Sequence, residues 1–260
     1  MKPEELKINT LSEIEIKIYF NKLSLEQLQE VMDKIDSKND YNVEDYRTDY
    51  LADANKLFTP RKTIKSTARV VEMNLPYDLT CNISENFITI NKTGKFDKYA
   101  GMDLYIPEVA KILKVMFEVN PTLSIDFVTI RKINNLFVFD KKEIFMYVSN
   151  KYTNLINDSS NEIHLNIENL VKLENNIDGR VTVDIVEGSL EGEKAYQINF
   201  ELEYGKEYYK PVELEELIKE MREINSCIFD EYMKTLDNKF FEDTKSGNKI
   251  VGINENARRD

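Results

Sequence analysis

The stretch Ser124–Val148, SIDFVTIRKINNLFVFDKKEIFMYV, decides how the rest of the chain is arranged. Residues 125–130 alternate between two faces with a period of two, which predicts a strand. A second apolar run, Leu136–Phe139, follows a polar interruption. Asp140 then opens a helix, because Glu143 stands three residues later as the reciprocal partner of a capping box. The stretch therefore predicts two strands and a helix near the middle of the chain.

On either side of this stretch, the chain reads as two halves with one order: strand, helix, three strands, helix. Leu11–Phe20 alternates strictly and is the clearest strand, and Ser24 with Gln27 forms a capping box for the next helix. The other elements expected in the first half are a segment Val43–Leu57 that suits a solvated strand or a short helix, strands at Ile64–Leu75 and Ile83–Ile90, and a helix begun by Pro107. Those expected in the second half are strands at Ile163–Leu173, Arg180–Val186 and Ala195–Tyr204, turns at Asp178-Gly179 and around Gly188 and Gly192, and a helix from Pro211 to about Phe241.

These elements predict an α+β fold, a large and mainly antiparallel sheet of about eight strands with the long helices packed on one face. We expect a first half over residues 1–122, a second half over 123–243 packed with the first as one body, and a polar tail over 244–260. The shared order of elements fits a pseudo-duplication. No residue-level repeat aligns the halves, so duplication and coincidence both stay open.

The composition is that of a folded protein, with 42% hydrophobic and 32% charged residues in a chain of 260. Acidic side chains number 47 against 35 basic ones, a formal net charge of −12, so binding of nucleic acid is not expected unless a local basic patch overrides the average. Cys81 and Cys227 match no metal spacing and fit reduced thiols. No run approaches the roughly 18 apolar residues of a membrane helix. No secretory signal opens the sequence, so we expect a cytoplasmic protein without membrane contact.

Few residues offer catalytic chemistry. His164 is the only histidine and no glycine-rich phosphate loop is present, so we expect no cofactor and no zinc site. The sharpest catalytic candidate combines Asp126, Asp140 and Lys142. In a metal-dependent nuclease, two carboxylates would hold a divalent ion that lowers the pKa of water, and the lysine would stabilise phosphate charge. In the simpler interpretation, Asp140 is a helix cap and Asp126 faces solvent. We therefore favour a protein that is not an enzyme, with the nuclease as an alternative.

Two sets of polar residues are candidates for binding. The first is the only basic concentration in this acidic chain: Arg61, Lys62, Lys65 and Arg69. These cations could hold a phosphate or an acidic partner, or form a solvated face. The second set is Arg131 and Asn134, which interrupt the apolar strands where the halves join. Arg131 could pair with a ligand carboxylate or with an internal Glu or Asp, and Asn134 could make a turn.

Three segments carry a resemblance to a known family: LSEIEIKIYF at 11–20, FVTIRKIN at 127–134 and INSCIFDEYMKTL at 224–236. In this order they resemble a sporadically distributed, uncharacterised bacterial family with a strand P-I-x-E-x-x-x-x-I-x-F and a central R-x-I-N. Arg131 and Asn134 match the central motif, whereas Leu11 replaces the proline and Thr129-Ile130 replaces Gly-Leu. The second half is also similar to export-chaperone folds of the SecB kind. The family's patchy distribution implies a mobile or phage-defence gene, and no catalytic residue is carried over.

Together these observations favour a non-catalytic accessory or regulatory subunit that binds another protein, in a mobile or antiviral defence locus. Three alternatives stay open: a SecB-like chaperone for unfolded segments, the metal-dependent nuclease, and an acidic mimic of nucleic acid. The sequence does not identify the partner.

Overall fold

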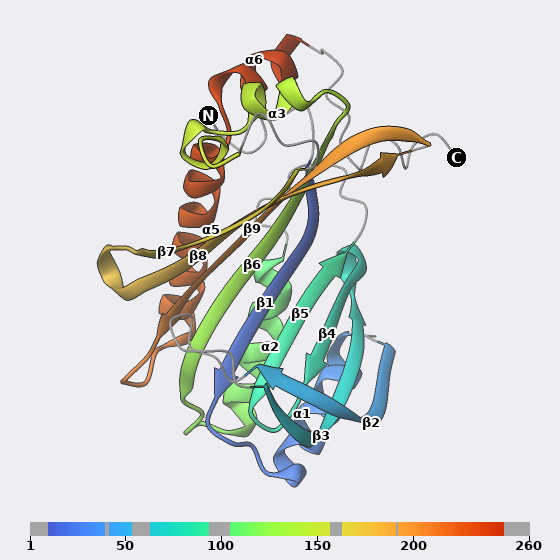
Figure 1. Cartoon of the computed structure of the whole chain (residues 1–260). Coiled ribbons are helices and arrows are strands. Elements are labelled where there is room, and N and C mark those ends of the chain that lie inside the picture. Colours follow the sequence, from blue (N-terminus) through green and yellow to red (C-terminus); the bar gives the residue numbers. More distant parts are fainter. Residues whose placement is uncertain are drawn as a thin grey trace.

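The strands in the described part of the chain form one nine-stranded antiparallel sheet, in the order β2-β3-β4-β5-β1-β6-β9-β8-β7 (Figure 1). The computed structural model describes residues 10–39, 42–53, 63–93, 105–156, 163–190 and 192–246. The fold is therefore α+β with a large antiparallel sheet, as the sequence predicts. The sheet has one strand more than the expected eight.

The two halves of the chain supply the two sides of the sheet. The first half contains β1 (Leu11–Phe20), α1 (Leu25–Asn39), β2 (Asn42–Asp53), β3 (Thr63–Leu75), the 3₁₀ turn η2 (Pro76–Asp78), β4 (Leu79–Ile83), β5 (Phe87–Thr93) and α2 (Ile106–Val119). The second half contains β6 (Ile125–Val138), α3 (Lys141–Tyr147), α4 (Asn150–Thr153), β7 (His164–Lys172), η4 (Glu174–Asn176), β8 (Ile177–Leu190), β9 (Glu193–Glu207), α5 (Leu214–Thr235) and α6 (Asn238–Ser246).

Alternation along the strands sends one set of side chains into a core beneath the helices. In β1, Ile14, Ile16 and Ile18 are buried, and each contributes about 1.5–3 kcal/mol through removal of apolar surface from water. The side chains between them, including Glu13 and Glu15, face the other side. Helices α1, α2 and α5 cover the core side of the sheet, with α2 in contact with both others (Figure 1). The short helix α3 and the terminal helix α6 lie together at one end of the sheet (Figure 1).

The two halves meet at the centre of the sheet, where β1 pairs with β6 and Ile16 lies opposite Ile130. From this pair outward, the registers of the two halves agree. The successive cross-strand neighbours are Ile90, Cys81 and Met73 outward from Ile16, and Tyr204, Gly179 and Val171 outward from Ile130. An approximate twofold axis through the central pair therefore relates β1, β5, β4 and β3 to β6, β9, β8 and β7.

Local features repeat along with the register. The hairpins β3–β4 and β7–β8 turn through residues with positive φ: Tyr77 and Asp78 at 68° and 56°, and Asn175 and Asn176 at 68° and 57°. Two successive positive φ values are typical of type I′ turns, whose twist matches that of antiparallel strands. The helices that follow β1 and β6 also begin alike, with capping boxes at Ser24 and Asp140. Sequence identity is low, but both halves fold on one plan.

Strand β6 corrects the interpretation of the central stretch. The polar run Arg131–Asn135 continues the strand, so Ile125–Val138 is one strand and not two. Asn134 accordingly makes no turn. The run stays extended because β1 pairs with it up to Asn134 and β9 pairs with it from Phe127 to Val138. Ladder hydrogen bonds on both sides override the weak strand preference of the polar residues.

Three further boundaries differ from the expectation. Asp178-Gly179 lies inside β8, and the chain turns at η4 before it. Residues 84–86 interrupt the single strand expected at Ile83–Ile90, which gives β4 and β5 instead. Within the ambiguous segment Val43–Leu57, the described residues belong to strand β2.

The C-terminal helix also differs from the expectation. It begins at Leu214, three residues after Pro211, and ends at Thr235, after which α6 runs to Ser246. The break follows Leu236, which forms an isolated bridge with Val148. Of the polar tail expected over 244–260, the first three residues belong to α6 and the remainder lies outside the described residues. None of the described helices is long and apolar enough to cross a membrane.

Candidate binding surface

The side of the sheet opposite α1, α2 and α5 is here called the open face. It carries the side chains that alternate with the core residues, so its composition follows from the register. The carboxylates on it along β1, β6, β9, β8 and β7 are Glu13, Glu15, Glu168, Asp178, Asp184, Glu193, Glu201, Glu203 and Glu207, and the cations are Lys17, Arg131, Lys172 and Arg180. Carboxylates therefore outnumber cations on the open face.

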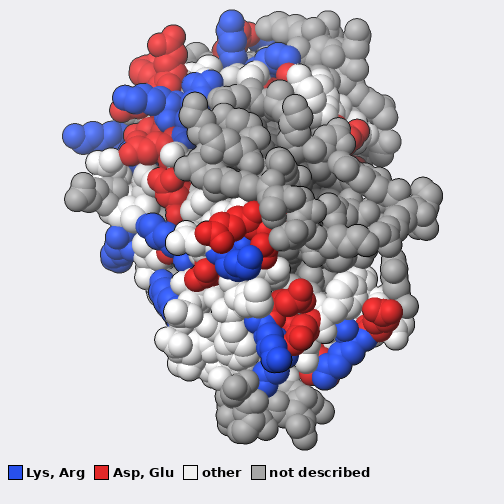
Figure 2. Space-filling model, turned by 90° about the horizontal axis from the view of Figure 1, so that it is seen from above, with Lys and Arg blue, Asp and Glu red and all other residues white. Residues whose placement is uncertain are grey.

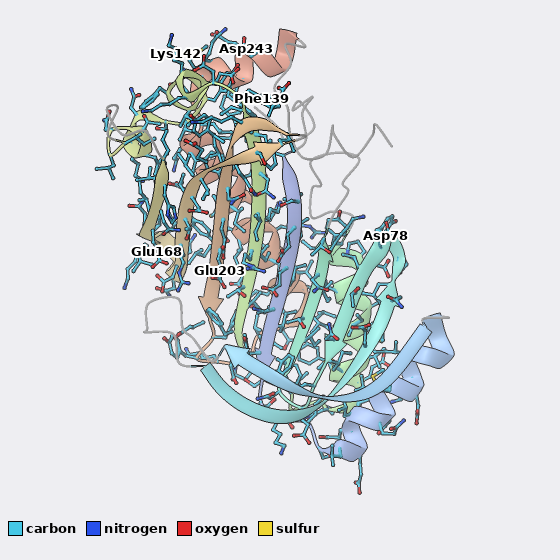
Figure 3. The ribbon with its side chains drawn as sticks, turned by 45° about the vertical axis from the view of Figure 1, so that its right-hand side comes forward. Asp78, Phe139, Lys142, Glu168, Glu203 and Asp243 are labelled. Atoms are coloured by element: carbon cyan, nitrogen blue, oxygen red, sulfur yellow. The ribbon has the colours of Figure 1, made fainter. Side chains whose placement is uncertain are left out.

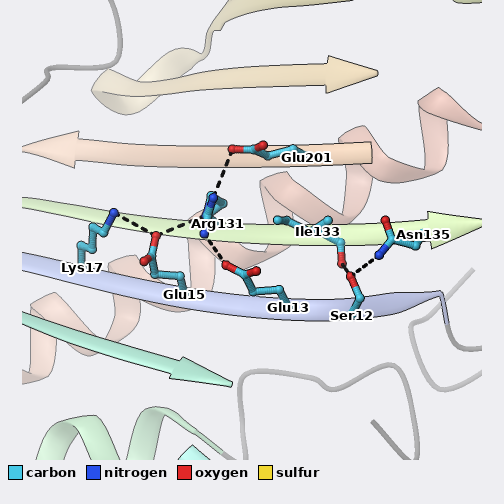
Figure 4. Close-up of polar contacts among 8 residues, drawn as sticks. All are labelled: Ser12, Glu13, Glu15, Lys17, Arg131, Ile133, Asn135 and Glu201. Atoms are coloured by element: carbon cyan, nitrogen blue, oxygen red, sulfur yellow. Dashed lines mark hydrogen bonds and ion pairs between the residues drawn. The ribbon is translucent and has the colours of Figure 1, made fainter. Parts of the chain in front are cut away.

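Arg131 stands at the centre of the open face and binds carboxylates from both neighbouring strands (Figure 4). Its Nη2 donates to Oε1 of Glu13, its Nε lies 3.2 Å from Oε1 of Glu15, and its Nη1 lies 3.5 Å from Oε1 of Glu201. Lys17 approaches the same Glu15 oxygen at 3.0 Å. The planar guanidinium group suits this role because its donors point in several fixed directions at once. Only 26% of the Arg131 side chain is exposed.

Charges and burial act together on the ionisation of this cluster. Burial alone would lower the pKa of Arg131, but Glu15, Glu13, Glu201 and Glu203 together raise it above its ordinary value. Burial also raises the pKa of Glu203, and the positive charge of Arg180 offsets this only in part. Arg131 therefore stays charged, and Glu203 binds a proton more readily than an exposed glutamate does.

Ser12 extends the ordered part of the open face along β1 and β6. Its hydroxyl donates to the carbonyl oxygen of Ile133 at 3.1 Å and accepts from Nδ2 of Asn135 at 2.7 Å (Figure 4). Because these side chains are bonded to one another, the centre of the open face is held in one arrangement rather than sampling many rotamers.

In the view from above, the surface carries charges of both signs in a mixed arrangement, unlike the open face with its excess of carboxylates (Figure 2). Seen from above, the described Lys and Arg side chains are interleaved with Asp and Glu and do not form a patch of one sign (Figure 2). Figure 3 places Glu168 and Glu203 on the sheet, well away from Lys142 and Asp243 at the helical end. The acidic part of the open face is thus distinct from the mixed charges at that end.

On the core side, directly behind this cluster, polar groups connect the sheet to α5. Thr10 Oγ1 lies 2.6 Å from the Tyr232 hydroxyl and donates to Oδ1 of the buried Asn134 at 3.2 Å. Since the threonine proton goes to Asn134, Tyr232 is the donor in the first bond. Lys132 is buried on this side as well. Asn134 thus has a structural role beneath α5, which its place in the sequence motif does not indicate.

No protein-family model matches the chain, and no curated protein matches it in sequence. The resemblance to a sporadically distributed bacterial family and to SecB-like folds therefore stays a prediction.

The structure does not bring the catalytic candidates together. Asp126 is exposed near the start of β6, and Asp140 follows its end. Twelve residues of extended strand separate them by about 40 Å, far more than the ~4 Å that separates paired catalytic metal ions. Asp140 accepts from the backbone N–H of Lys142 and caps α3. A shared metal ion is thus ruled out for this pair, and no group of metal-binding side chains occurs among the described residues.

The basic candidates lie wholly or in part outside the described residues. Arg61 and Lys62 lie outside the described residues. Lys65 and Arg69 belong to β3, opposite Leu51 and Arg47 of β2, but their side chains are outside the described part. His164 is exposed on β7, with Nε2 at 3.9 Å from Oδ1 of Asp184.

Sequence reasoning singled out Arg131 and missed its partners. Glu15 and Glu203 are its direct cross-strand neighbours, and Glu13 and Glu201 lie beside them. The alternation of Glu13, Glu15 and Lys17 in β1 was the available signal, because it shows a strand face rich in charge. Which face of β1 and of β9 contacts Arg131 depends on the pairing of strands that are far apart in sequence. The local sequence pattern does not reveal that pairing.

Replacing Arg131 by methionine is expected to destabilise the protein by about 2 kcal/mol at pH 7, because it leaves three adjacent carboxylates without their common cation. Without Arg131 the pKa of Glu203, which burial already raises, rises further, so the deficit shrinks as the pH falls toward the titration range of this carboxylate. Urea denaturation at several pH values measures both effects. Arg131→Lys keeps the positive charge but lacks the planar guanidinium group with its several donors, so it should show an intermediate loss of stability. Equal stability of the unmodified protein and both variants would contradict the role given to Arg131.

Proposed function

We propose that this protein is a non-catalytic accessory or regulatory subunit that docks a basic surface of another protein on its open face. The observation that carries the proposal is the excess of carboxylates on a broad sheet surface that the described helices leave uncovered. Complementary charge speeds association and selects the partner.

The order of the open face supports this proposal. Its central side chains are already bonded to one another around Arg131, so little side-chain entropy is lost when a partner binds. The carboxylates that Arg131 does not engage, such as Asp178 and Asp184, remain available at the margin. A rigid centre with charged margins suits docking of a folded protein.

The other candidate functions fit the geometry less well. Binding of unfolded segments calls for an exposed apolar groove, whereas the open face is charged. A nuclease would need the carboxylates that β6 keeps apart. An acidic mimic of nucleic acid shares the excess of carboxylates and differs in its partner, which would be a DNA-binding protein. A place in a mobile or antiviral defence locus is a prediction that the neighbouring genes can test.

Charge reversal at the margin of the open face is expected to abolish capture of the native partner. The variant Asp178→Lys/Asp184→Lys changes two partly exposed side chains that Arg131 does not engage. Purification from the source cells should recover one stoichiometric protein with the unmodified chain and lose it with this variant. The same complex should weaken with added salt, because exposed charges are screened.

The matched control is Glu215→Lys/Glu216→Lys, which makes the same change of charge on exposed residues of α5. This control should retain the partner. Loss of binding in both variants would show that the net charge of the protein, and not the open face, determines binding. Retention of the partner by both variants would refute the open face as the docking site. Competition by duplex DNA for the captured protein would identify the mimic instead.

A further inference from the structure

The outer edge of β7 differs from its counterpart in the first half. The twofold relation of the halves places β7 where β3 stands. Strand β2 covers the outer edge of β3 as an antiparallel neighbour over its whole length. In the described part of the chain, no strand pairs with the outer edge of β7, which ends the sheet. The fold thus accepts an antiparallel strand at one of two equivalent positions and leaves the other open.

The backbone of β7 is oriented to receive such a strand. The Leu173 N–H donates to the carbonyl oxygen of Ile177 at 2.9 Å, and the Glu187 N–H donates to that of Ile163 at 3.1 Å. Odd-numbered residues of β7 therefore bond to β8. In an antiparallel ladder the alternate residues direct their N–H and C=O groups to the opposite side. The outward groups belong to the even-numbered residues, among them Glu168, Leu170 and Lys172.

We propose that a second copy of this chain binds at this edge, with the two β7 strands pairing antiparallel about a twofold axis at Leu170. In this register Leu170 of one copy faces Leu170 of the other, and Glu168 faces Lys172 in both directions. Each of these pairs joins outward-directed residues, so the backbones exchange hydrogen bonds at all three. The 51% exposed Leu170 side chains gain an apolar partner, and opposite charges meet on either side of them.

The core side of β7 fits the same register. Ile167 would lie opposite Leu173, and Val171 opposite Asn169. Ile167, Val171 and Leu173 are only partly buried in the single chain, although they pack against the core. Pairing would cover them with equivalent side chains, which stabilises an edge strand and protects it from less specific association.

Neighbouring registers lack this complementarity. A twofold axis at Glu168 would place two glutamates opposite each other, and an axis at Asn169 would place Glu168 opposite Leu170. Like charges directly opposite are destabilising in antiparallel pairs. Of these three registers, only the one centred on Leu170 is self-complementary, which favours a second copy over an unrelated extended peptide. This interface lies at the edge of β7, and it does not depend on the docking of a basic protein, although Glu168 and Lys172 also lie on the open face.

Exchange of the paired charges tests the interface. Glu168→Lys alone and Lys172→Glu alone each create two like-charge pairs per dimer, and each should weaken self-association about tenfold. The double variant Glu168→Lys/Lys172→Glu restores opposite pairs and should restore association. Sedimentation equilibrium from about 1 μM to 1 mM measures the mass against 30.5 kDa for one chain. A monomer throughout this range, or singles that associate like the unmodified chain, would overturn the proposal.

A cysteine at the axis gives a second readout that depends on register. Paired Cα atoms in a hydrogen-bonded antiparallel pair lie about 5.5 Å apart, within the range for a disulfide. In a Cys227→Ser background, Leu170→Cys should form a covalent dimer under mild oxidation. Leu25→Cys on α1 is the matched control, since Leu25 is 52% exposed, and it should stay monomeric. Equal cross-linking of both variants would contradict the axis at Leu170.

Discussion

Replacing Lys132 by methionine is expected to stabilise the protein by about 1–4 kcal/mol at pH 7, as when buried charge is exchanged for well-packed apolar side chains. Lys132 is only 1% exposed, on the core side of β6 between Ile14 and Leu202. Burial lowers its pKa to about 7, because a medium of low dielectric constant disfavours the ammonium ion. Methionine has a similar length and flexibility and carries no charge.

The pH dependence of this effect has a definite sign. The folded-state pKa of Lys132, about 7, lies below its ordinary value of 10.5. Between these pH values the unfolded chain holds a proton that the folded chain has released, so the stability of the unmodified protein rises with pH. The advantage of Lys132→Met is therefore greatest at pH 7 and below, and it shrinks toward pH 10. Urea denaturation at about pH 6, 8 and 10 measures the difference.

Lys219→Met serves as the control, since Lys219 is exposed on α5. It should change the free energy of unfolding little, with no added dependence on pH. A Lys132→Met protein that is less stable than the unmodified one at every pH would show that the ammonium group stabilises the fold.

Gly179→Ala is expected to destabilise the protein by about 3 kcal/mol, the upper part of the range for overpacked cores. A Cβ at Gly179 would lie 2.3 Å from Cε1 of Tyr204, its cross-strand neighbour. The Tyr204 ring is fully buried and cannot swing into solvent. The cost therefore comes from displacing the ring, and thermal or urea unfolding measures it.

Two further variants separate this clash from a general effect of alanine in a strand. Gly188→Ala lies in the same strand with no atom within 4 Å of the added Cβ, and it should be tolerated. Tyr204→Leu removes the ring, so the double variant Gly179→Ala/Tyr204→Leu should be more stable than the sum of the single changes predicts. Strict additivity would show that the ring is not the cause.

Elements with a single strong pattern could be predicted from the sequence. Their patterns are local in sequence, so they can be recognised without knowing which distant residues they contact. Examples are the alternation of β1, the capping boxes at Ser24 and Asp140, and the apolar stripe of α2. The polar run in β6 was misread because its strand conformation depends on ladders with β1 and β9. Asp178-Gly179 was misread as a turn because glycine there makes room for Tyr204, a contact between strands that the sequence does not reveal.

The candidate site was predictable only in part. Arg131 could be singled out because an arginine interrupts an apolar strand, and pairing with internal carboxylates was one of two interpretations. Its partners come from β1 and β9, which lie far from it in sequence. Lys132 was missed because a lysine beside an arginine suggests solvent, whereas alternation places the two on opposite sides of the sheet.

The pairing of β1 with β6 at the centre of the sheet has a consequence for folding. Strand β1 cannot pair along its second edge until β6, more than a hundred residues later in the chain, has been synthesised. Until then, the first half exposes a strand edge with unpaired backbone groups that other chains can reach. Contacts so distant in sequence slow folding. We therefore expect the nascent chain to depend on chaperones, and its first half to aggregate when made alone.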